Sequence, residues 1–265
     1  MVFSPPSWAI GLVLAAAVVA VAWRLGALSA GGAWTAATLG VVSMGAGWSW
    51  GILLIAYFVT SSLLTRFRAG EKLARTEDRA DKAGARDAQQ VVANGGAYGI
   101  MALSYWLAPG EIWQALAAGA LAASAADTWA TEIGTLARGE ARSIIGWHPV
   151  PTGTSGGVTA LGLGGSVAGA GMVAGVAWLL GWPISTVVAA LAGGLVGSLV
   201  DSVLGASLQA RRHCTTCNAI TERLVHGCGT RTDVVGGIEW LDNDGVNAIA
   251  TLFGAVTGAA IATFV

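Results

Sequence analysis

Hydrophobic runs long enough to cross a lipid bilayer follow one another along almost the whole chain. A helix that spans the hydrocarbon core needs about 20 predominantly apolar residues, and roughly 17–25 are tolerated. Such runs predict eight helices, at residues 8–23, 33–47, 48–65, 90–108, 112–135, 156–181, 184–209 and 246–264. The second run is short and rich in glycine, so a half-helix or re-entrant segment, leaving seven spans, is the alternative. We expect an all-α integral membrane protein in which residues 1–265 form a single polytopic domain.

Composition favours the same class. Of the 265 residues, 54% are hydrophobic and 11% are charged, whereas about 25% are charged in an ordinary soluble domain. The 39 glycines agree, because glycine is more frequent in membrane helices than in soluble ones. No basic surface is apparent, so no nucleic-acid partner is expected. The first run has no basic segment before it, and we expect it to be retained as a span and not cleaved as a signal peptide.

The basic residues predict the orientation. All 14 Lys and Arg residues fall in segments that the eight-helix topology places on one side of the membrane. Most lie in a basic loop at 66–89 and in a Cys/His loop at 210–240, while the opposite turns carry Glu111 as their one charge. Lys and Arg are concentrated in the cytoplasmic loops of membrane proteins. We therefore expect a multi-pass protein of the cell membrane with both loops in the cytoplasm.

An internal repeat is also predicted. Residues 109–138 and 183–212 align without a gap at an offset of 74, which matches Asp127 with Asp201. Both segments run from the outer turn to the inner side, so the repeat is parallel. Chance similarity between two helices rich in Ala and Gly is the alternative explanation.

Several carboxylates fall inside or at the inner ends of these helices. An aspartate within a span costs a few kcal/mol, so it usually faces a cavity and marks a functional site. Asp127 and Glu132 fall on the polar side of one helix, Asp201 lies in its repeat partner, and Asp244 begins the last helix. Pairing of Asp127 and Asp201 with arginines or backbone, for packing alone, is the alternative.

A glycine-rich segment, Pro151–Gly157, precedes the sixth run. It is similar to a phosphate-binding loop, although the GKS or GKT ending of a Walker A motif is absent. Glycines allow backbone N–H groups to face an anion, and the following helix N-terminus adds the positive end of its dipole. Carboxylates beside such a loop suit Mg²⁺ held jointly by protein and phosphates. Phosphoryl transfer needs mainly positioning and charge neutralisation, which these groups could supply.

Five segments, in order, resemble the phytyl-phosphate kinase family: 85–96, 126–134, 151–159, 197–206 and 241–247. The resemblance extends over roughly residues 30–264. It implies a membrane kinase that transfers a phosphoryl group from a nucleoside triphosphate, CTP or ATP, to an isoprenoid monophosphate. The product would be the diphosphate, and phytyl, farnesyl and geranylgeranyl phosphate are all candidate acceptors.

The residues expected to carry this chemistry fall into two groups. The catalytic, Mg²⁺-binding carboxylates are expected to be Asp127, Glu132, Asp201 and Asp244. The nucleotide- or phosphate-binding residues are expected to be Lys82, Arg86, Asn94, Arg138, Thr154, Ser155, Gly156, Gly157 and Asn247. Functions that compete with the kinase are a secondary transporter, for which repeats and intramembrane carboxylates are typical, a lipid-phosphate cytidylyltransferase, and a non-catalytic scaffold. The parallel repeat and the crowding of polar residues at the inner ends argue against a transporter.

The three cysteines form a compact motif with one histidine. Cys214 and Cys217 are two residues apart, and His226 and Cys228 follow closely. Three thiolates and an imidazole match a tetrahedral structural zinc site. A reducing cytoplasm favours metal over a disulfide. Unligated thiols and a redox sensor are the alternatives.

Overall fold

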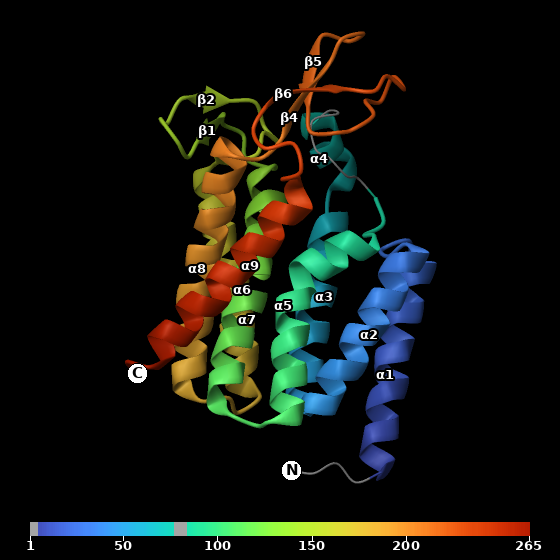
Figure 1. The fold of residues 1–265 in the computed structure, drawn as a ribbon, viewed down its shortest axis with the longest axis vertical. Helices are drawn as coiled ribbons and strands as arrows, with labels where there is room; N and C mark the ends of the chain where they lie inside the picture. The colour runs from blue at the N-terminus through green and yellow to red at the C-terminus, as the bar shows by residue number, and fades with distance from the viewer. Residues whose placement is uncertain (1–4, 77–83) are drawn as a thin grey trace.

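The computed structural model describes residues 5–76 and 84–265. Within this part, eight long helices lie where the hydrophobic runs predict them. They are α1 (Pro5–Arg24), α2 (Ala30–Ala46), α3 (Trp48–Arg66), α5 (Ala88–Leu107), α6 (Glu111–Gly134), α7 (Ala160–Leu179), α8 (Ile184–Ser207) and α9 (Asn243–Ala262). The helices run side by side in one bundle, and successive helices alternate in direction (Figure 1). The short second run is a helix along its whole length and not a half-helix.

Four of these helices, α3, α7, α8 and α9, are both long and apolar enough to cross a membrane. Helix α2 has 17 residues, about 26 Å at 1.5 Å per residue, and α5 and α6 carry polar residues that lower their mean hydropathy. That all eight helices cross the membrane therefore stays a prediction. Large apolar side chains point outward from the bundle, among them Ile100, Val167 and Val256 at 62%, 57% and 65% exposure. Such a surface suits contact with lipid.

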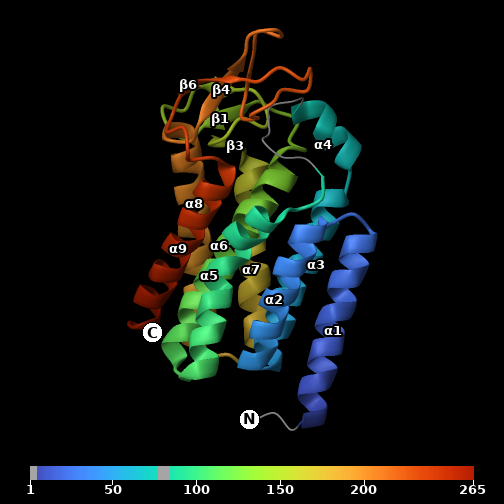
Figure 2. The ribbon, with the colours of Figure 1, turned by 45° about the vertical axis from the view of Figure 1, so that its right-hand side comes forward.

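One end of the bundle carries structure that the hydrophobic pattern does not predict. A short helix, α4 (Ala69–Thr76), and two antiparallel three-stranded sheets lie there (Figures 1 and 2). The first sheet has the order β2-β1-β3, and the second has the order β5-β4-β6. Their strands are β1 (Ala141–Ser143), β2 (Pro149–Val150), β3 (Gly157–Val158), β4 (Arg211–Cys214), β5 (Ala219–Thr221) and β6 (Asp233–Gly236). Strands of two to four residues are too short to show an alternating pattern. The segments that carry the described Lys and Arg residues lie at this same end.

Small residues hold the centre of the bundle together. The middle of α6, from Ala117 to Ala126, is buried throughout, and α6 packs against α7, α8 and α9. A Cβ atom added to Gly193 of α8 would lie 2.8 Å from the Cα of Gly119 in α6 and would also collide with the Gly254 carbonyl of α9. Helices that approach this closely need glycine at the contact. The backbone of α6 is therefore held tightly on three sides.

Helices α6 and α8 carry the two copies of the predicted repeat. Each has 24 residues, and they pack against one another. The copies place Asp127 and Asp201 near the same ends of the two helices. A repeat in the evolutionary sense stays a prediction.

Candidate active site

A cavity of about 440 Å³ opens at the end of the bundle that carries the two sheets. Six helices contribute to its wall among the described residues, because α4, α6 and α8 end there while α5, α7 and α9 begin there. The acidic residues Asp127, Asp201 and Asp244 line it, together with the glycine-rich segment. Local capping determines where two of the helices begin: Asp87 and Gln90 form a capping box at α5, and Asp242 caps α9.

Asp127 and Asp201 meet inside the cavity. Their carboxyl groups lie close enough to interact electrostatically, and Oδ2 of Asp201 is buried with no hydrogen-bond partner among the described residues. Two carboxyl groups this close repel when both are ionised, so they either share a proton or bind a cation. Asp244, 7% exposed, lines the same cavity from α9. The structure thus brings these three aspartates to one cavity, as the sequence predicts.

The glycine-rich segment lies against the end of α8. Gly156 has a φ of +74°, and a Cβ atom there would come within 2.5 Å of the Ser202 carbonyl oxygen. Within the loop, Thr154 N–H donates to Pro151 O and Gly157 N–H donates to Thr154 O. The N–H groups of Ser155 and Gly156 donate to no backbone carbonyl in the described chain. Both residues line the cavity, just ahead of the N-terminus of α7.

Glu222, which the sequence analysis did not select, also lines the cavity. It follows β5 in the Cys/His loop and reaches back to the bundle. Its carboxylate accepts hydrogen bonds from Ser155 Oγ and, at 2.8 Å, from Gln209 Nε2. Glu222 is the one acidic residue between Cys214 and Arg231, but nothing in the local sequence connects it with the bundle. The 210–240 loop thus reaches the cavity itself.

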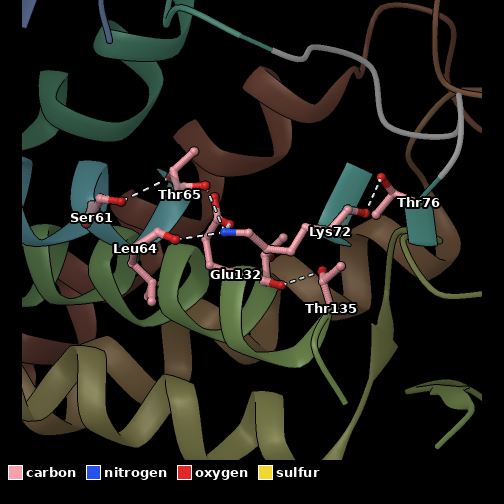
Figure 3. A network of polar contacts seen from close by, with 8 residues as sticks. Ser61, Leu64, Thr65, Lys72, Thr76, Glu132 and Thr135 are labelled. Carbon is pink, nitrogen blue, oxygen red and sulfur yellow. Dashed lines mark hydrogen bonds and ion pairs between the residues drawn. The ribbon is translucent and has the colours of Figure 1, made fainter. Parts of the chain in front are cut away.

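Glu132 does not line the cavity. Its carboxylate forms an ion pair with Lys72 of α4 at 2.5 Å (Figure 3). The buried Lys72 ammonium also donates to the carbonyls of Leu64 and Thr65, at 2.7 and 2.8 Å, in the last turn of α3. This network fastens α4 to α3 and α6, and Thr76 at the end of α4 reaches the cavity wall. The predicted grouping of Glu132 with the three aspartates is not found.

The remaining predicted residues are dispersed. Arg86 and Asn94 line a separate apolar groove, and Arg138 lies beside an open surface hollow. Asn247 is buried in α9 and is not part of the cavity lining, while Lys82 lies outside the described residues. Over residues 5–76 and 84–265, no Lys or Arg lines the cavity.

The chain is similar to a known family of membrane proteins over most of its length. Residues 13–255 match the family described as "Integral membrane protein DUF92". The chain belongs to this family. Protein PGR of Arabidopsis thaliana is 29% identical over 234 residues, which cover 78% of this chain and 79% of the plant protein. No solved structure matches the chain. The matched part of the DUF92 chain contains every residue that lines the cavity.

An apolar groove of about 70 Å³ lies beside the polar cavity in this DUF92 protein. Helices α1, α2, α3 and α5 line it with side chains such as Val18, Leu39 and Phe58. Gln90 lines both the groove and the cavity, so the two adjoin at the start of α5. Two residues of the groove lining contact Ser124 of α6: the Tyr57 and Ser124 hydroxyls are 2.6 Å apart, and Ser124 donates to Asn94 Oδ1 at 2.7 Å.

The predicted metal-binding residues of the Cys/His loop are brought together. The ligand atoms of Cys214, Cys217, His226 and Cys228 all lie within 4.8 Å of one another. Hydrogen bonding with Cys228 raises the pKa of Cys217 to about 11, and hydrogen bonds with Thr230 and His226 lower the pKa of Cys228 to about 5. Among the described residues, the cavity carboxylates are not grouped this closely.

Proposed function

We propose that this DUF92 protein is a Mg²⁺-dependent prenyl-phosphate kinase. It transfers a phosphoryl group from CTP or ATP to an isoprenoid monophosphate and forms the diphosphate. The observation that carries the proposal is the cavity in which the paired carboxyl groups of Asp127 and Asp201 lie beside a glycine-rich loop and a helix N-terminus. This combination suits a metal-bound polyphosphate.

Asp127, Asp201 and Asp244 would hold the Mg²⁺, and Glu222 replaces Glu132 as the fourth carboxylate of the site. The chemistry of the donors fits, because hard oxygen ligands are those that Mg²⁺ prefers. Oδ2 of Asp201 is buried without a hydrogen-bond partner in the described part of the chain, so a bound cation would stabilise this atom most. When bound, the metal neutralises phosphate charge and orients the transferring group.

The backbone would carry much of the phosphate binding. Because the described cavity lining has no Lys or Arg, the N–H groups of Ser155 and Gly156 and the N-terminal end of α7 are the available positive groups. Lys82, Arg86 and Arg138 remain candidates for contacts with the outer parts of the nucleotide.

The reaction needs no strong general base. An oxygen of the acceptor monophosphate attacks the γ-phosphorus, the bond to the β,γ-bridging oxygen breaks, and the nucleoside diphosphate leaves with that electron pair. A phosphate monoester is already largely ionised near pH 7. The carboxylates therefore act electrostatically and not as proton acceptors.

The apolar groove supports a lipid substrate. A prenyl chain held between α1, α2, α3 and α5 would bring its phosphate to Gln90, where the groove adjoins the cavity. The cavity opens at the end of the bundle with the basic segments, so we infer that it faces the cytoplasm, where nucleoside triphosphates are found. We infer the cell membrane as the location.

Reconstituted protein tests the proposal directly. We expect ATP or CTP to be consumed only when farnesyl, geranylgeranyl or phytyl monophosphate is present, with the matching nucleoside diphosphate and prenyl diphosphate as products. Release of pyrophosphate from CTP would identify a cytidylyltransferase instead. Movement of prenyl phosphate across the bilayer without nucleotide consumption would identify a transporter.

A further inference from the structure

The Cys/His loop contains a second site that the proposed kinase reaction does not use. Cys214 ends β4 and Cys217 lies in the turn between β4 and β5. His226 and Cys228 lie in the segment between β5 and β6. The hydroxyls of Thr216 and Thr230 join the two turns at 2.9 Å. Two pairs of ligands, separate in the sequence, thus face one another.

The distances between these side chains fit a tetrahedral metal. Cys214 Sγ lies 3.6 Å from Cys228 Sγ, and His226 Nδ1 lies 3.4 Å from the same sulfur. Zinc bonds of about 2.3 Å to sulfur and about 2.0–2.1 Å to nitrogen place tetrahedral ligands about 3.8 Å apart for S···S and about 3.6 Å apart for S···N. A disulfide would need about 2.05 Å, and all three cysteines are free.

We propose that Cys214, Cys217, His226 and Cys228 bind one Zn²⁺ as a closed structural site. Thiolate and imidazole ligands select zinc over the hard cations Mg²⁺ and Ca²⁺. Four protein ligands complete the tetrahedron and leave no position for water or substrate, which distinguishes a structural from a catalytic zinc. The proposal does not depend on the kinase activity.

The proposed zinc would stabilise the β5-β4-β6 sheet and the position of Glu222. The β5-β4-β6 sheet has strands of three or four residues, and a metal that joins its two turns adds its binding free energy to the stability of this small element. Glu222 lies between the two ligand pairs and is hydrogen-bonded to Ser155 and Gln209 at the cavity. The zinc site therefore positions Glu222 and holds the sheet over the glycine-rich loop.

Elemental analysis of the purified full-length protein tests the site. We expect about one zinc per chain in the wild type and in His148→Ala, a variant of an exposed histidine outside the cluster. His226→Ala should lose the metal, whereas His226→Cys should keep it, because a fourth thiolate preserves the ligand set. Protein grown with Co²⁺ should show the charge-transfer bands of a tetrahedral thiolate complex.

Hydrogen exchange measures the consequence for the fold. A zinc chelator should raise exchange in residues 211–236 while α6 and α8 stay protected. Glu222→Gln should retain the zinc, because Glu222 is not a ligand. A wild-type protein without zinc, or equal zinc in His226→Ala and wild type, would overturn the proposal. Unchanged exchange after zinc removal would refute the positioning role.

Discussion

Replacement of Asp201 by Asn removes one charge from the cavity while it keeps the shape of the side chain. In the structure, Oδ2 of Asp201 is buried without a partner among the described residues and its carboxyl group contacts Asp127. In the proposed site that oxygen binds the metal. Loss of one preorganised electrostatic group lowers turnover by about 10²–10³-fold, or about 2.7–4 kcal/mol. We therefore expect Asp201→Asn, and likewise Asp127→Asn, to lose at least about 10²-fold in turnover.

Folding should survive this change. An amide costs less to bury than a carboxylate, and the substitution removes repulsion from Asp127 and Glu222. The thermal midpoint should therefore stay level or rise. The assay is the initial rate of prenyl diphosphate formation in a Mg²⁺ titration. A weakened metal site needs more Mg²⁺ to reach half-maximal rate, so high Mg²⁺ should restore part of the turnover.

Glu132→Gln is the matched control, because it makes the same charge change on α6 outside the cavity lining. It breaks the ion pair with Lys72, whose ammonium keeps its bonds to the carbonyls at the end of α3. We expect a loss of about 1.5–3 kcal/mol in the free energy of unfolding, the range for a hydrogen bond to a charged group. The Mg²⁺ dependence should not change. Wild-type rates in both aspartate variants at low Mg²⁺ would make these residues packing groups and refute the reasoning.

Three further predictions concern topology, the loop and the groove. Cysteines introduced at Arg75 and Arg223 should react with an impermeant thiol reagent from the cytoplasmic side alone, and labelling from outside would reverse the orientation. Gly156→Ala should raise the KM for the nucleotide at least several-fold with helix content unchanged, because a Cβ atom collides with α8; an unchanged KM would remove the loop from the site. Val91→Trp, which fills the groove, should lower kcat/KM for long-chain prenyl phosphates, whereas the outward-facing Val92→Trp should not. Equal effects of the two would exclude the groove as the chain site.

Helix positions follow from the residue pattern because the required apolar length is a local property. Each of the eight predicted runs coincides with a long helix to within four residues at either end. The aspartates could also be selected from the sequence, since a carboxylate in an apolar helix is costly wherever it lies. The Cys/His motif could be found for a similar reason: its ligands are close in sequence.

Which polar residues share the cavity depends on helix rotation and on neighbouring segments. Glu132 is five residues after Asp127, about 140° around the helix at about 100° per residue, so it points to α4 while Asp127 points to α8. No feature of the local sequence predicts that Glu132 pairs with Lys72 of α4, or that Glu222 contacts Ser155. Both contacts join segments 60 or more residues apart, and packing of the whole bundle alone brings such segments together.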